Sequence, residues 1–138
     1  MWQASVAELN HYPGPRRVLE LAEALELAEG QRRATTELHE ETRREAIRLG
    51  EELVAQEQRL NRIFAWNQAT ENNIAKIVLD IGTLKAQLRL THLVANIRQK
   101  PLLTEEQVRR YDELQGRGMD SGKSSNKMGC SGAHHHGR

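Results

Sequence analysis

The sequence has few aromatic residues, one cysteine and no long apolar run. Its 138 residues include one Phe, two Trp and two Tyr, although a compact core normally uses aromatic rings because each ring buries a large apolar area. The single cysteine excludes an intramolecular disulfide, and no apolar run reaches the roughly 18 to 20 residues that span a bilayer. The many Leu, Ala, Glu and Arg residues instead predict helices packed along seams.

The sequence also lacks an excess of one charge. Lys and Arg number 20 against 19 Asp and Glu, which gives a net charge of +1, and the two signs are interleaved. Such a balance directs the chain toward neither nucleic acid nor an anionic membrane. The opening MWQASVAELN has no basic start followed by an apolar stretch, and it therefore predicts no signal peptide.

The three prolines of the chain all lie outside the two long helices that we expect. Pro13 and Pro15 flank Gly14, so residues 1–15 are predicted to be an extended or turn segment. A short helix is predicted over residues 16–27. No proline occurs again before Pro101, and this long interval predicts two further helices.

Apolar residues recur every three or four positions in both halves of this interval. The first long helix is predicted over residues 31–66, a length of about 54 Å, and the second over residues 71–98. The seam of the first helix consists of Leu38, Thr42, Ala46, Leu49, Leu53, Glu57, Leu60 and Phe64. The seam of the second consists of Ile74, Ile77, Ile81, Leu84, Leu88, Thr91 and Ala95. Because residues 67–70 make so short a connection, the two helices must be antiparallel, and Thr70 is predicted to cap the second.

A last short helix and a tail complete the predicted organisation. Thr104 and Gln107 stand in a capping-box arrangement before an apolar stripe. After Leu114 the chain is rich in Gly and Ser and has no Leu, Ile, Val or Phe, so it cannot bury enough apolar surface to fold. We therefore predict an all-α fold in which a helical hairpin domain, residues 16–115, lies between the extended segment and a disordered tail, residues 116–138.

No arrangement of residues in the sequence predicts catalysis. The chain has no Gly-rich phosphate loop and no HExxH zinc motif, and no Ser, His and Asp stand in the context of a catalytic triad. His39-Glu40-Glu41 lacks a second histidine four residues on. We therefore expect that the protein is not an enzyme.

Metal binding is the chemistry that the histidines favour. The tail combines Cys130 with three histidines, His134, His135 and His136. Thiolate and imidazole are natural ligands for a divalent transition metal such as zinc, nickel, cobalt or copper. The alternative interpretation is a solvated low-complexity end or a cloning remnant.

A second candidate metal site lies between the two long helices. If the turn centres near residue 68 or 69, facing residue numbers sum to about 137, which places His92 opposite Glu45. His39 lies less than two turns further along. A carboxylate and an imidazole in this arrangement can supply two ligands. The alternative is a half-buried His92 that only forms a hydrogen bond with Glu45.

One short segment near the end of the helical region resembles a known family signature. Leu103-Thr104-Glu105-Glu106-Gln107 is similar to the LTxxQ motif of the Spy/CpxP group of periplasmic proteins, which includes heavy-metal sensors and zinc-resistance-associated proteins. The family has a second copy before the first long helix, where this chain has Leu27-Ala28-Glu29-Gly30-Gln31. The similarity implies a four-helix, hook-shaped subunit that forms a homodimer with a concave face in the periplasm.

The resemblance also implies roles for two residues of the hairpin. In the metal-sensing branch, a Glu on the first long helix and a His followed four residues later by Met on the second contribute to a metal site. The matching positions here are Glu45 and His92. Asn96 stands at the Met position, and the paired HxxxH near the N-terminus is missing, which leaves only His11 there.

The sequence supports three hypotheses about function. The first is a periplasmic, metal-responsive accessory protein that communicates with a membrane-bound signalling protein. The second is an ATP-independent holdase chaperone, in which arginines and exposed Leu or Ile side chains bind unfolded envelope proteins. The third is a helical scaffold with no ligand.

Overall fold

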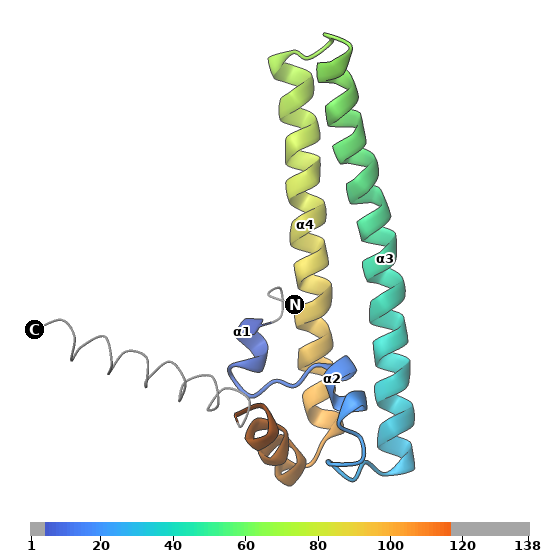
Figure 1. Cartoon of the computed structure of the whole chain (residues 1–138), viewed down its shortest axis with the longest axis vertical. Helices are drawn as coiled ribbons and strands as arrows, with labels where there is room; N and C mark the ends of the chain where they lie inside the picture. The colour runs from blue at the N-terminus through green and yellow to red at the C-terminus, as the bar shows by residue number, and fades with distance from the viewer. Residues whose placement is uncertain (1–4, 117–138) are drawn as a thin grey trace, which may run out of the picture.

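The computed structural model describes residues 5–116, and every regular element in that range is helical. Two long antiparallel helices dominate the molecule, and the short elements gather at the end of this pair that lies opposite the turn (Figure 1). The elements in chain order are α1 (Ser5–Glu8), α2 (Pro15–Glu20), α3 (Glu29–Ala65), α4 (Glu71–Gln99), the 3₁₀ turn η2 (Lys100–Leu102) and a final helix over residues 105–116. The predicted all-α class and the long helical pair are thus confirmed. None of the helices among the described residues has the length and apolar character needed to cross a membrane.

The turn between α3 and α4 is closed by side-chain and backbone hydrogen bonds. The Thr70 hydroxyl accepts from the Asn73 backbone N–H at 3.1 Å, and the Asn73 side-chain oxygen accepts from the Thr70 N–H at 2.8 Å. These bonds form a capping box with Asn in place of the usual Glu or Gln. Asn67 has a left-handed φ of 55°, and the N–H of Gln68 bonds back to the carbonyl of Ile63, as in the Schellman motif that ends many helices. The predicted cap at Thr70 is confirmed.

The seam between the long helices differs from the prediction near the turn. The seam of α4 is as predicted, because Ile77, Ile81 and Ala95 are buried. On α3, Glu57 and Phe64 were predicted seam positions, but both are exposed, whereas their neighbours Gln56 and Ile63 are half-buried. The heptad steps beyond Leu53 therefore run three, four, three rather than four, three, four. A shift of one residue turns a side chain by about 100° around the helix axis, and this shift places Phe64 in solvent.

A small apolar core lies at the base of the hairpin, opposite the turn. Four buried residues from α2, the segment after it, the segment after η2 and the final helix form it: Val18, Leu25, Leu103 and Tyr111. Half-buried side chains pack around them, namely Leu21, Leu27, Val108 and Leu114. We call this cluster the basal core. It joins the residues before α3 to the residues after α4.

The helix α2 is shorter than the helix predicted over residues 16–27. Regular α-helix ends at Glu20, and residues 21–26 form turns. Glu26 has a left-handed φ of 53°, and the Leu27 N–H bonds back to the Ala22 carbonyl at 3.1 Å. This Schellman arrangement reverses the chain. The apolar spacing of residues 18–25 fits a helix, but the entry into α3 requires the chain to turn before residue 27.

For residues 1–15 we predicted an extended or turn segment, but the described part of this segment also contains helix. Its single helical turn, α1, packs against α4. The Asn96 side-chain amide donates to the Tyr12 carbonyl at 2.7 Å, and His11 Nδ1 lies 2.7 Å from Asp112 Oδ2 of the final helix. These contacts order a segment whose prolines alone predicted only an irregular path.

The two LTxxQ-like segments meet through their glutamines. Gln31 Nε2 donates to Gln107 Oε1 at 2.7 Å, and Gln107 Nε2 donates to Gln31 Oε1 at 3.1 Å. The same nitrogens also donate to backbone carbonyls from the opposite end of the chain, those of Leu102 and Leu25. We call this arrangement the glutamine pair. It lies beside the basal core and closes the base of the hairpin.

The glutamine pair also caps two helices, but not equally. Gln107 Oε1 accepts from the Thr104 N–H, and the Thr104 hydroxyl accepts from the Gln107 N–H, which makes a complete capping box. Gln31 Oε1 accepts from the Ala28 N–H at 2.9 Å. Ala28 has no side-chain acceptor, so only half of the box forms at α3.

Replacing Ala28 by Thr should complete the first capping box. Ala28 is exposed and has extended backbone angles of φ −68° and ψ 160°, so an added hydroxyl can accept from the Gln31 N–H. We expect the free energy of unfolding, measured by urea titration, to rise by about 1 kcal/mol. The control Ala28→Val has a similar shape without the hydroxyl and should bring no such gain. Equal stabilisation by both variants would contradict the capping explanation.

Candidate functional site

Glu45 lies in an open groove between α3 and α4. Its apolar lining residues are Leu38, Leu90, Val94 and Ala95, and its polar ones are Glu41, Thr42, Arg44, Glu45, Arg48, Thr91 and Arg98. Arg48 donates two hydrogen bonds to Glu45, one to each carboxylate oxygen, at 2.9 and 2.8 Å. These bonds lower the pKa of the Glu45 carboxyl. The carboxylate is therefore ionised at neutral pH, but the Arg48 guanidinium already bonds to both of its oxygens.

His92 is not among the residues that line this groove. It is half-buried on α4, and burial lowers the pKa of its imidazole. Its neighbour Thr91 lines the groove with Glu45 instead, because adjacent residues of a helix point about 100° apart. No hydrogen bond or ion pair joins Glu45 to His92, and His92 has no hydrogen-bond partner among the described residues.

The described part of the chain does not assemble a complete metal site. Within residues 5–116, no group of three His, Cys, Asp or Glu side chains could hold one ion. His39 is half-buried on α3. The tail candidates Cys130, His134, His135 and His136 lie outside the described residues. Metal binding by Glu45, His92 or the tail therefore stays a prediction.

Asn96, the residue at the family's Met position, has a clear structural role. Its side chain is 2% exposed, and its amide donates to the Tyr12 carbonyl at 2.7 Å. A Cβ at Gly14 would lie 3.6 Å from the same amide nitrogen, so the N-terminal segment passes close to this side chain. A Met could not donate this bond. The position therefore anchors the N-terminal segment to α4.

A second apolar stripe runs along α4, which the predicted seams did not include. It comprises Leu79, Thr83, Ala86, Leu90, Leu93 and Ile97, and we call it the outer stripe. Three of its members are strongly exposed: Leu79 at 70%, Leu90 at 59% and Ile97 at 60%. Each member of the outer stripe stands two residues after a member of the α3-facing seam. Two residues correspond to about 200° of rotation, so the stripe lies on roughly the opposite face of α4. A heptad search continued past the first seam could have found it.

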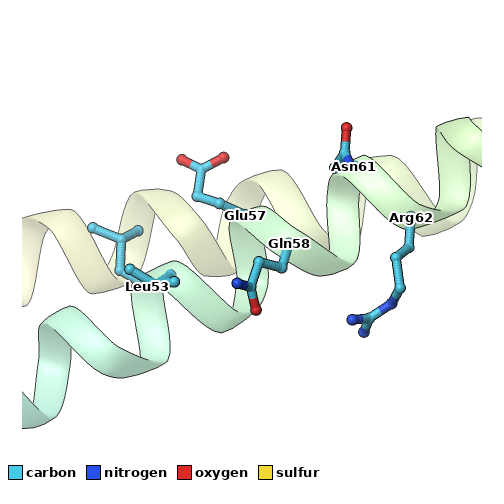
Figure 2. A pocket seen from close by; sticks show the side chains of 6 residues that line it. Leu53, Glu57, Gln58, Asn61 and Arg62 are labelled. Atoms are coloured by element: carbon cyan, nitrogen blue, oxygen red, sulfur yellow. The ribbon is translucent and has the colours of Figure 1, made fainter.

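A shallow hollow on α3 near the turn offers little to a small ligand. Its lining residues all come from one helix: Leu53, Val54, Glu57, Gln58, Asn61 and Arg62. Figure 2 shows Glu57 and Asn61 projecting to one side of α3 and Arg62 to the other. A ligand pocket normally encloses most of its ligand, so this hollow is an open surface of α3.

Comparisons with known proteins add no relative to these observations. No family model matches the chain, and neither a curated protein nor a solved structure matches it. The similarity to the Spy/CpxP group therefore depends on the two LTxxQ-like segments and their positions around the long helical pair.

The half-buried imidazole of His92 predicts a pH-dependent stability. Because burial lowers its pKa in the folded state, the unfolded chain takes up a proton first as the pH falls below about 6.5. Acidification then costs folding free energy. We expect the free energy of unfolding to fall between about pH 7.5 and 5.5, and to fall less in His92→Gln. An unchanged fall in His92→Gln would contradict the explanation.

Proposed function

We propose that this protein is a non-enzymatic holdase that binds apolar segments of unfolded proteins through the outer stripe of α4. The observation that supports this function is the exposure of Leu79, Leu90 and Ile97, each more than half accessible to solvent. Contiguous exposed apolar surface typically marks an interaction site. The resemblance of the LTxxQ-like segments to the Spy/CpxP group supports the same class of function and a periplasmic location.

The outer stripe offers a client weak and reversible binding. Full burial of a Leu or Ile side chain contributes about 1.5–3 kcal/mol. Because Leu79, Leu90 and Ile97 still expose more than half of their surface, the three together can contribute roughly 3–5 kcal/mol before the costs of association. Without those costs this would correspond to about millimolar affinity, so one short segment binds no more tightly than that. Such a site holds an unfolded chain only through repeated contacts and releases it without ATP.

The groove beside the outer stripe extends this surface with positive charge. Leu90 belongs to both the groove and the stripe, so the two are continuous. Arg48 is paired with Glu45 and Arg98 with Glu41, whereas Arg44 takes part in none of the ion pairs among the described residues. Arg44 can therefore donate to a carboxylate or a backbone carbonyl of a client.

The triple variant Leu79→Gln, Leu90→Gln and Ile97→Gln tests the holdase proposal. We measure light scattering of a reduced, aggregating client at increasing concentrations of the protein, with and without chelator. The concentration needed for half suppression should rise at least about tenfold in the variant, since this needs a loss of only about 1.4 kcal/mol. Chelator should have no effect. Circular dichroism checks that the helices are intact.

The matched control carries Ile47→Gln and Val54→Gln, which remove exposed apolar residues from α3 instead. It should suppress aggregation as well as the wild type does. Equal suppression by the triple variant would overturn the proposal. Sedimentation velocity of the wild type, the triple variant and the control shows whether each forms the expected homodimer. If only the triple variant is a monomer, the outer stripe is a self-association surface.

Metal binding is a second candidate function, and the state of His92 favours it. Metals bind the neutral form of imidazole, and burial lowers the pKa of His92 so that this form predominates near neutral pH. The ring nitrogens also have no hydrogen-bond partner among the described residues. The remaining ligands would come from Glu45, the tail or a second subunit.

Calorimetric titration of the metal-free protein with zinc, nickel, cobalt and copper tests this second function. We expect at least one ion to bind more tightly than about 1 mM, which is about 4 kcal/mol, and His92→Ala to weaken that binding. Gln87→Ala, at an exposed position of the same helix, is the matched control. A variant with His134, His135 and His136 changed to Ala distinguishes a tail site from a hairpin site. Binding no tighter than about 1 mM for all four ions would exclude metal as a ligand.

A further inference from the structure

The tip of the hairpin, residues 59–76, presents aromatic side chains to solvent. Phe64 is 58% exposed and Trp66 is 65% exposed, and Phe64 is the only Phe in the chain. The tip lies at the opposite end of the hairpin from α1, α2 and the final helix (Figure 1), so none of these elements covers it. We propose that the tip inserts its aromatic side chains into the headgroup region of an anionic phospholipid bilayer.

The turn at the tip carries no charge that would oppose insertion. Residues 66–70 read Trp-Asn-Gln-Ala-Thr, and the nearest ionisable side chains are Arg62 and Glu71. Charged groups are costly to move away from water, whereas Trp favours the membrane–water interface because its ring has an apolar body and a polar N–H. An uncharged turn that contains Trp66 and directly follows Phe64 is therefore suited to the headgroup layer.

Positive charge lies directly behind the aromatic side chains. Arg59, Arg62 and Lys76 stand against one acid, Glu71, between residues 59 and 76, a local balance of 3 − 1 = +2. All three cations are exposed, and none takes part in the ion pairs among the described residues. The net charge of +1 for the whole chain hides this local excess, beyond which the next charges on the two helices are the acids Glu57 and Asp80. Each cation near an anionic leaflet strengthens binding about fivefold, or about 1 kcal/mol.

The small size of the tip favours a bilayer over a protein partner. Two helix ends, each about 10–12 Å across, present a footprint of roughly 200 Å². A stable protein interface buries about 800 Å² on each partner, so two helix ends supply only about a quarter of that area. A bilayer needs no complementary surface and gains from each inserted ring separately. Insertion at the tip is independent of client binding at the outer stripe.

Fluorescence of Trp66 in the full chain tests the proposal directly. Trp2→Phe makes Trp66 the only Trp. We expect its emission to shift to shorter wavelength on addition of phosphatidylcholine vesicles that contain phosphatidylglycerol, and brominated lipids to quench it. Arg59→Gln with Arg62→Gln should weaken vesicle binding roughly 25-fold, the product of two fivefold effects. Emission that vesicles leave unchanged, or that shifts only when an unfolded client is added, would overturn the proposal.

Vesicle co-sedimentation supplies the second measurement. The variant Phe64→Ser with Trp66→Ser should no longer sediment with vesicles, whereas the control Ile47→Gln with Val54→Gln should sediment like the wild type. Both pairs replace exposed apolar residues, so circular dichroism should show intact helices in each. Retained sedimentation of the Phe64, Trp66 variant would assign any membrane contact to another surface and overturn the proposal.

Discussion

Two glutamine side chains join the start of α3 to the start of the final helix, and the order of the base depends on them. Gln31 and Gln107 bond to each other, to the first N–H groups of their own helices and to carbonyls of the opposite segment. A single hydrogen bond contributes only about 1 kcal/mol net, but removing one partner leaves several part-buried groups unpaired, at about 1–3 kcal/mol each. The final helix also brings Asp112 to His11, and Asn96 bonds the same N-terminal segment to α4. A residue at the base thus indirectly orders a segment some distance along α4.

Much of the hairpin could be predicted from the sequence, because its information is local. Helix caps depend on residues three apart, and the cap at Thr70 has the predicted bonds. The seam of α4 is also as predicted, since Ile residues mark it unambiguously. The seam of α3 is less well specified near the turn, where Leu53 and Leu60 permit either Gln56 or Glu57 between them. Only the packing of the two helices decides between steps of three and four.

The candidate site could be predicted less well, because it depends on rotation about the helix axis. The hairpin register brings the part of α3 around Glu45 next to the part of α4 around His92. Within α4, however, Thr91 and not His92 lines the groove with Glu45. The preference of Glu45 for Arg48, three residues along the same helix, was equally accessible from the sequence. Exposure of the outer stripe could not be known without the structure, because a heptad pattern does not say which of two opposite faces a partner covers.

The chain separation of the glutamine pair has a consequence for how the molecule folds. The two residues are 76 positions apart, and closing so long a loop in an unfolded chain carries a large entropic cost before any contact compensates it. The α3–α4 turn, by contrast, closes between immediate sequence neighbours. Once the hairpin has formed, it brings the two distant ends together and most of that entropic cost has been met. Folding should therefore proceed from the turn toward the base, and the segments around Gln31 and Gln107 should open and close as one cooperative unit.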